Sequence, residues 1–255
     1  MSSDYKVPAI DNMVKIFHTL SVNASSGLTQ NEISRQTGLN RSTVFRLLKG
    51  LHQYNLVSYD SSKKTYNLGH LLVYLGGKAS EVLSNLDRFQ PYLLEIAKRT
   101  GQTAILTQLY GHNELIYIAK QESMNDHRIN VNIGQIRPLN STAAGKVFLA
   151  DRTDEEIDMY LSEDLKAYTN KTLVEKGVFM EEIKKIREKG YAISNEEFKL
   201  GLSGIAVPIY DQNQQLLFVM FISCFSAQLT DVKVNEYRDI LIETANRINE
   251  TLLSN

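Results

Sequence analysis

The sequence predicts an α+β protein with three parts: a winged helix-turn-helix domain over 1–69, a linker helix over 70–84 and a second domain over 85–255 with an antiparallel sheet. Three observations predict this division. Residues 29–54 have the pattern of two short helices joined by a tight turn. Two short strand patterns follow at 56–68. After residue 100 the apolar period changes from that of a helix to the alternation of a strand, and it then changes repeatedly.

The first part of the chain carries clear signals for helix starts and ends. A helix is expected over 10–20, with an apolar stripe formed by Ile10, Met13, Val14, Ile16, Phe17 and Leu20. Thr29 and Glu32 have the spacing of a capping box, in which each side chain satisfies a free backbone N–H of the other residue. This helix is expected to end at Gly38, and Asn40 is expected to cap the next one.

The helix after Asn40 has one apolar and one polar face. Its buried stripe is predicted to contain Val44, Leu47, Leu48, Leu51 and Tyr54. Side chains at the start of such a helix reach base edges when the helix enters a major groove. The predicted DNA-binding residues of the motif are Thr29, Asn40, Arg41, Ser42, Thr43, Phe45, Arg46 and Lys49. The alternative is an exposed helical hairpin within an α-helical core, because helical hairpins are common.

A β-hairpin is predicted directly after the helix-turn-helix, which is the position of the wing in a winged helix. Its strands span 56–59 and 65–68, with a polar turn between them. Lys63 and Lys64 at the tip are expected to contact DNA phosphates, although a solvated turn is the alternative. The first 70 residues carry a net charge of +4 and the remainder −5. This asymmetry indicates a basic, DNA-binding domain followed by a domain with a different function.

The sequence contains no motif that predicts an enzyme. Gly145-Lys146 does not fit a phosphate-binding loop, the five histidines lack a zinc-ligand spacing, and no nucleophile elbow occurs. The adjacent acidic pairs at 181–182 and 196–197 are interpreted as solvated charge. We therefore expect no catalytic residue, no metal and no cofactor. The single cysteine, Cys224, lies in an apolar run and is expected to be buried and inert. The N-terminus lacks a signal peptide's apolar run and no stretch is long enough to span a membrane, so a cytoplasmic location is expected.

The order of these elements, and several motifs, resemble the IclR-type transcriptional regulators. The motifs are "LTQNEISRQTGLNRSTVFRLLKGL", "TYNLGHLLVYLG", "PLNSTAAGKVFLA" and "EEFKLGLSGIAVPI". The resemblance extends from about Ala9 to Leu253. It implies a transcriptional regulator, expected to be a repressor, that binds double-stranded DNA at a pseudo-palindromic operator as a homodimer or dimer of dimers. It also implies a GAF/PAS-like second domain that binds a small-molecule effector.

The elements of the second half are read from the apolar period and the turn residues. A linker helix is expected over 69–84, where Gly76-Gly77 indicates either a hinge or close helix packing. Helices are expected over 86–100, 143–150, 153–161 and 176–189 and from Asp231 onward. Strands are expected over 103–110, 114–120, 128–133, 191–194, 204–210 and 216–223.

The resemblance also implies which residues of this chain contact the effector. They are Ala143, Ala144, Ser194, Leu202, Gly204, Phe221 and Ser223. Family members that sense small acids carry Cys at the position of Gly204 and Ser at that of Phe221. We therefore hypothesise a larger or flatter ligand with Phe221 as an apolar wall. The alternative is that Phe221 belongs only to the core, because alternate strand residues are normally buried.

One rival from another functional class remains open on the sequence alone. A metabolite-binding enzyme or adaptor with a protein-binding helical head would share the same pattern of elements. Such a protein would show turnover, or partner binding that does not depend on salt, whereas binding to DNA phosphates weakens as salt rises.

Overall fold

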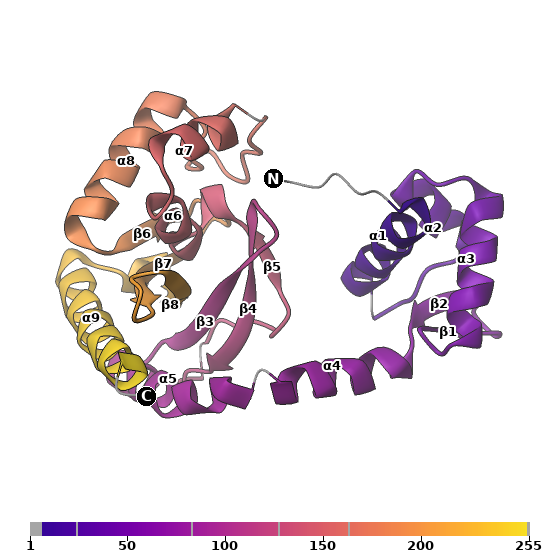
Figure 1. Cartoon of the computed structure of the whole chain (residues 1–255), viewed down its shortest axis with the longest axis horizontal. Helices are drawn as coiled ribbons and strands as arrows, with labels where there is room; N and C mark the ends of the chain where they lie inside the picture. The colour runs from indigo at the N-terminus through magenta and orange to yellow at the C-terminus, as the bar shows by residue number, and fades with distance from the viewer. Residues whose placement is uncertain (1–6, 24, 83, 127, 163, 254–255) are drawn as a thin grey trace. The chain divides into compact units, whose positions relative to one another are not determined.

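The structure is a computed structural model that describes residues 7–253 except 24, 83, 127 and 163, and side chains of 80–85 and 252–253 are not discussed. The chain divides into two compact units, Met1–Ser84 and Asn85–Asn255. The two units are shown in Figure 1, and each is described by itself.

The first unit contains helices α1 (Pro8–Val22), α2 (Gln30–Thr37) and α3 (Arg41–Gln53), strands β1 (Val57–Asp60) and β2 (Thr65–Leu68), and helix α4 (His70–Val82). Strands β1 and β2 form an antiparallel hairpin, and Leu28 adds backbone hydrogen bonds to Tyr66 beside it. The buried core consists of Ile16, Leu20, Leu28, Ile33, Val44, Leu48, Leu51 and Val57. These elements are those of a winged helix.

Two details of the predicted stripes were wrong. Ile10 and Val14 are 52% and 40% exposed, because the core-facing row of α1 runs through Met13, Ile16 and Leu20. Tyr54 is 65% exposed, because α3 ends at Gln53 and Tyr54 is its C-terminal cap. The backbone leaves the helix there, so the side chain no longer follows the buried face. The first error comes from predicting an apolar stripe wider than the face of α1 that contacts the core, and the second from extending the 3.6-residue period past the end of α3.

Helix α4 is continuous through Gly76-Gly77. A Cβ atom built at either glycine would have no neighbour within 4 Å among the described residues. Close packing within this chain therefore does not explain the two glycines. Each lowers the stability of the helix by about 1 kcal/mol relative to alanine.

The second unit is built on an antiparallel sheet of six strands in the order β5-β4-β3-β8-β7-β6. The strands are β3 (Thr103–Tyr110), β4 (Glu114–Gln121), β5 (Ile136–Pro138), β6 (Ala192–Asn195), β7 (Leu202–Tyr210) and β8 (Leu216–Phe225). Five of them are close to the predicted ranges and β5 is not. Residues 128–133 do not form the predicted strand, because Gly134 and Gln135 take the backbone hydrogen bonds of Tyr117 at that edge of β4.

Helices cover both faces of this sheet (Figure 1). On one face lie α6 (Ala143–Ala150), α7 (Asp154–Leu161) and α8 (Lys176–Lys189), and on the other lie α5 (Gln90–Thr100) and α9 (Asp231–Leu253). Short 3₁₀ turns occur at Ser84–Phe89, Leu139–Ser141 and Ser226–Gln228. Successive residues of β8 alternate between the two cores: Phe221 packs with α6–α8, and Met220 and Ile222 pack with α5 and α9. Among the described residues, none of the helices is both long and apolar enough to cross a membrane.

Candidate DNA-binding surface and effector cavity

Helix α3 presents its polar side chains to solvent. Arg41, Ser42, Arg46 and Lys49 are exposed, while Val44 and Leu48 on the opposite side are fully buried. Phe45 is 51% exposed and contributes little to the core. The helix therefore exposes a polar face to solvent, and the apolar residues of its opposite face pack in the core of the first unit.

Two of the predicted DNA-binding residues serve as helix caps. The Thr29 hydroxyl donates to Glu32 at 2.7 Å and accepts from its backbone N–H, so both of its hydrogen-bonding functions are used. Asn40 Oδ1 accepts from the N–H of Thr43 at 2.8 Å and from the Ser42 hydroxyl at 2.9 Å. The structure thus gives Thr29 and Asn40 the structural task of orienting α2 and α3, each cap being worth about 1 kcal/mol.

The wing tip is held by local hydrogen bonds. Asp60 Oδ1 accepts from the Ser62 hydroxyl at 2.6 Å and from the backbone N–H groups of Ser62 and Lys63. These bonds, the hydroxyl contact first, lower the pKa of Asp60. Lys64 adopts a positive φ of 56°, and both tip lysines are exposed. The turn therefore presents two cations from an ordered backbone.

The second unit contains a cavity of about 260 Å³ on the α6 side of its sheet. It is formed by the first turn of α6, by residues of strands β4 to β8, and by the loops around 129–135 and 198–199. Six of the seven expected effector-contacting residues line it: Ala143, Ser194, Leu202, Gly204, Phe221 and Ser223. Ala144 instead packs in the adjacent apolar core with 1% exposure.

Phe221 is both a core residue and a wall of the cavity. It is 6% exposed, and its ring lies 5.4 Å from that of Tyr117, which lines the cavity too. Gly204 pairs with Ser223 on β8, and a Cβ at this glycine would lie 2.7 Å from the carbonyl oxygen of Ile222. A side chain at position 204 thus requires the backbone to shift.

The first turn of α6 contains backbone N–H groups that have no acceptor within the helix. The Thr142 hydroxyl accepts from the N–H of Gly145 at 3.0 Å, which leaves the N–H groups of Ala143 and Ala144 without an intrahelical acceptor. Gly145 is required because a Cβ there would lie 2.2 Å from the carbonyl oxygen of Leu139. The helix therefore starts against the 3₁₀ turn 139–141, and its N-terminal partial positive charge lies beside the cavity.

The sequence patterns did not single out several cavity residues. Arg137 lies with its guanidinium carbon 4.5 Å from the ring centroid of Phe198 and 5.8 Å from that of Tyr117. Ser141, Thr142 and Lys199 also line the cavity. Arg137, Ser141 and Thr142 lie in or directly before the "PLNSTAAGK" motif, which was the available signal.

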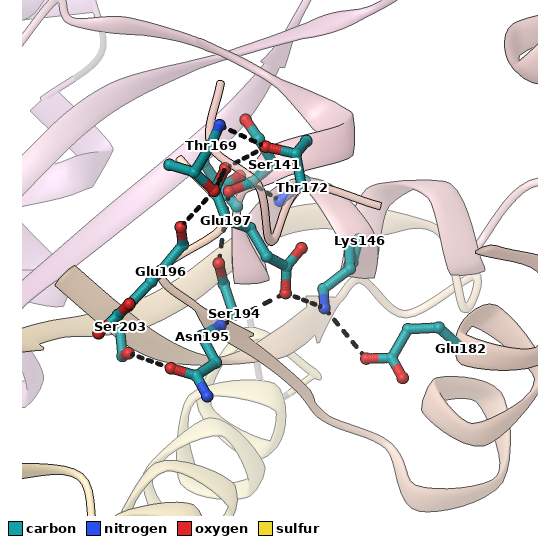
Figure 2. Close-up of polar contacts among 12 residues, drawn as sticks. Ser141, Lys146, Thr169, Thr172, Glu182, Ser194, Asn195, Glu196, Glu197 and Ser203 are labelled. Carbon is teal, nitrogen blue, oxygen red and sulfur yellow. Dashed lines mark hydrogen bonds and ion pairs between the residues drawn. The ribbon is translucent and has the colours of Figure 1, made fainter. Parts of the chain in front are cut away.

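Outside the lining of this cavity, Lys146, Glu182 and Glu197 form an ion cluster whose lysine is buried (Figure 2). Lys146 Nζ lies 2.8 Å from Glu197 Oε1 and 3.0 Å from Glu182 Oε1, and the side chain of Lys146 is 1% exposed. Burial raises the pKa of Glu197, and Lys146 opposes this shift. Interpreting the pair 196–197 as solvated charge was therefore wrong for Glu197, whose side chain is 7% exposed.

The segment that carries Glu197 is fixed by further hydrogen bonds (Figure 2). The Thr172 hydroxyl donates to the carbonyl of Glu197 at 2.6 Å, and the Thr169 hydroxyl donates to that of Glu196 at 2.8 Å. Lys171 forms an ion pair with Glu196 at 2.8 Å. Since Phe198 and Lys199 follow immediately and line the cavity, these contacts hold one wall of the cavity in place.

A winged helix with an exposed polar recognition helix, joined to an α+β unit with a cavity on one side of its sheet, defines the class of DNA-binding transcriptional regulators that respond to small-molecule effectors. Comparison with known proteins agrees. Residues 9–61 match the family model described as "IclR helix-turn-helix domain", and residues 80–250 match "Bacterial transcriptional regulator IclR C-terminal". The chain belongs to the IclR family of transcriptional regulators, which are not enzymes.

Similar proteins cover nearly the whole chain. It is 28% identical over 249 residues to the HTH-type transcriptional regulator KdgR of Escherichia coli, covering 96% of this chain and 94% of that one. It is 29% identical over 230 residues to the transcriptional repressor IclR of the same organism, covering 89% and 82%. A crystal structure of an IclR transcriptional regulator from Alicyclobacillus acidocaldarius superposes with a TM-score of 0.85 at 29% identity, covering 96% of this chain and 99% of the other. The family assignment decides against the enzyme reading.

Proposed function

We propose that this regulator is a repressor, acting in the cytoplasm, that binds a pseudo-palindromic operator as a homodimer or dimer of dimers. Two copies of α3 would enter successive major grooves about one helical turn, or a multiple of it, apart. Arg46 supports this proposal most directly, because it is exposed near the middle of a helix whose other side is fully anchored. The relative named as a repressor is consistent with the sign of regulation.

Each predicted contact has its own role in this proposal. Arg41, Ser42, Thr43, Phe45, Arg46 and Lys49 would face bases or the sugar edge, and Lys63 and Lys64 would contact phosphates. Thr29 and Asn40 would act through the orientation of their helices and through nearby backbone N–H groups.

The effector would occupy the 260 Å³ cavity and change the placement of the DNA-binding heads through α4. This requires that the effector prefer one arrangement of the heads over the other. The uninterrupted run of α4 through two glycines with no close neighbour supports a bendable connection.

An operator-binding assay tests the proposal. The DNA just upstream of the gene is labelled, and binding of the full chain is followed by fluorescence anisotropy at several salt concentrations. We expect binding that weakens steeply with salt and a two-fold symmetric footprint. Binding that ignores salt, or a footprint without two-fold symmetry, contradicts the operator model. Transcription from that promoter in a reporter strain should fall when the regulator is expressed, and a rise would reverse the proposed sign.

A further inference from the structure

A second cavity, of about 670 Å³, lies at the outer edge of the sheet in the second unit. Strand β6 is the last strand of this sheet, so one of its sides has no neighbouring strand. This edge cavity is lined by Lys146, by residues 170–173, by one face of α8 between Glu182 and Lys189, and by residues of the segment 191–197. Its volume lies within the range of about 300–1,000 Å³ that is usual for small-molecule sites.

The edge cavity is separate from the effector cavity. Among the described residues, none lines both cavities. Successive residues of β6 face opposite sides, so Ile193 and Asn195 line the edge cavity while Ser194 lines the effector cavity. The two cavities can therefore hold two different ligands.

The charges on α8 favour an anion in the edge cavity. Lys185 and Lys189 lie one helical turn apart, and both are exposed and line this cavity. Among the described residues, no carboxylate lies within salt-bridge distance of either ammonium group. Lys171 on another wall differs, because it forms an ion pair with Glu196 at 2.8 Å. One face of α8 thus presents two cations whose charge is not paired within this chain.

The type of cation favours a phosphate over a carboxylate. Among the described residues that line the edge cavity, four are lysines and none is an arginine. The planar fork of arginine matches the two oxygens of a carboxylate, whereas lysine binds phosphate as a point charge on a flexible stem. A phosphate monoester also carries a charge of about −1.5 to −2 at pH 7, which matches two lysines better than the single charge of a carboxylate does.

Glu197 is a buried acceptor in the lining that lacks a donor. One oxygen of its carboxylate accepts from Lys146 Nζ at 2.8 Å and from the backbone N–H of Asn195 at 3.4 Å (Figure 2). The other oxygen, Oε2, is buried and has no hydrogen-bond partner among the described residues, although the side chain of Glu197 is only 7% exposed. Buried polar atoms normally have a partner, so a ligand hydroxyl that reaches Oε2 would supply the missing hydrogen bond.

The free edge of β6 adds backbone groups to the same cavity. The bond from Asn195 to Glu197 shows that Asn195 turns its backbone N–H away from β7. In an antiparallel pair the backbone groups of alternate residues point to the same side, so those of Ile193 also point to the outer edge. Ile193 therefore offers one N–H donor and one carbonyl acceptor, which suit the hydroxyl groups of a ligand.

We propose that the edge cavity is a second ligand site, which binds the phosphate monoester of a polyol, such as a sugar phosphate. The phosphate binds Lys185 and Lys189, and hydroxyls of the polyol bond to Glu197 Oε2 and to the backbone of Ile193. This site goes beyond the proposed function, because it is distinct from the effector cavity and does not depend on how the operator is bound.

Calorimetric titration of the full chain without DNA tests the site. The probes are ribose 5-phosphate and glucose 6-phosphate, each beside its parent sugar, and inorganic phosphate. We expect at least one ester to bind at least about 10-fold more tightly than its parent sugar and than inorganic phosphate, because only the ester carries both the charge and the hydroxyls.

Variants locate the binding. The double variant Lys185→Gln with Lys189→Gln should lower the affinity for the ester by about 10-fold or more. Lys184→Gln, which changes an exposed lysine of the same helix outside the lining, is the matched control and should leave this affinity unchanged. Glu197→Gln should weaken binding of the ester and leave the affinity for inorganic phosphate unchanged.

Several results would overturn the proposal. They are equal affinity for ester and sugar, inorganic phosphate that binds as tightly as the esters, and unchanged ester affinity in the lysine double variant or in folded Glu197→Gln. Loss of ester binding in Arg137→Gln, but not in the lysine double variant, would place the ligand in the effector cavity and overturn it as well. A thermal melt checks that each variant is folded, and the exposed lysines decide alone where Glu197→Gln does not fold. Since no DNA is present, a failed titration leaves the operator proposal standing, and a failed operator assay leaves this site standing.

Discussion

Replacing Lys146 with methionine tests how the buried ion cluster stabilises the second unit. Methionine keeps most of the length and apolar volume of lysine and removes the charge. Glu182 is 28% exposed and can be hydrated, but Glu197 is 7% exposed and its Oε2 atom has no hydrogen-bond partner among the described residues. The cost therefore falls on Glu197. Breaking a buried ion pair from one side costs about 3–5 kcal/mol, which is a large part of a typical stability of about 5–15 kcal/mol.

The effect of Lys146→Met should depend on pH. Burial raises the pKa of Glu197 above its ordinary value of 4.5, while Lys146 lowers it, so loss of the lysine raises the pKa further. A carboxyl whose pKa is higher in the folded state binds its proton more readily there. Its favourable contribution is complete below the unfolded pKa and is lost as pH rises through the folded pKa. The variant should therefore be close to wild type below pH 4.5 and become progressively less stable than wild type as the pH rises through the raised pKa of Glu197.

Urea denaturation followed by circular dichroism at several pH values measures this difference. The double variant Lys146→Met with Glu197→Gln should recover most of the loss at neutral pH, because no unpaired buried charge remains. Lys184→Met, which changes an exposed lysine on α8, is the matched control and should change stability by less than about 0.5 kcal/mol. A loss below about 1 kcal/mol at pH 7.5, with no dependence on pH, would refute this account of the cluster.

Three further predictions concern other parts of the chain. Arg46→Ala should weaken operator binding by about 1–3 kcal/mol and relax the sequence preference. Lys64→Ala should weaken binding to all sequences alike and lower the slope of log affinity against log salt concentration by about one. Footprinting and anisotropy across salt concentrations separate the two variants, and the same phenotype from both would contradict the assigned roles. Replacing Gly76 and Gly77 with alanine should stabilise α4 by about 1 kcal/mol at each site and reduce the effect of the effector on operator affinity, and an unchanged ratio of affinities with and without effector argues against bending at this point. Burial raises the pKa of Cys224 to about 12, so its thiol should not react with maleimide at pH 7.5 until the chain is unfolded, and rapid labelling of the native protein would contradict this burial.

Elements defined by local signals could be predicted from the sequence. Three such signals are the capping box at Thr29, the left-handed end of α2 at Gly38 and the cap at Asn40. Each of them depends on residues no more than four positions apart, so it can be recognised in one short stretch of sequence. The β3–β4 hairpin was predicted to within one residue for the same reason. The segment 128–133 was not, because whether it pairs with β4 depends on competition with residues 134–138 for the same edge.

The chemistry of the second unit depended on contacts between distant residues. Lys146 and Glu197 are 51 positions apart, and Lys146 and Glu182 are 36 apart, so no spacing rule connects them. The sequence analysis did not single out Arg137, whose guanidinium lies over the ring of Phe198 only because the fold brings β5 and residue 198 together. By contrast, six of the seven effector positions supplied by the family resemblance line one cavity, because β6–β8 and α6 bring their motifs together in the fold.

Helix α6 connects the cavity to the rest of the second unit through three of its first four residues. The first turn borders the cavity at Ala143, Gly145 lies against the turn 139–141 with no room for a Cβ, and Lys146 pairs with Glu182 of α8 and with Glu197. The helix has only eight residues, and these contacts restrict its movement. A ligand that draws its first turn into the cavity must therefore also move Lys146. Any such movement lengthens ion pairs in a buried environment, where separation is costly. An effector that binds without moving α6 avoids this cost, and one that moves it must supply the difference from its own contacts.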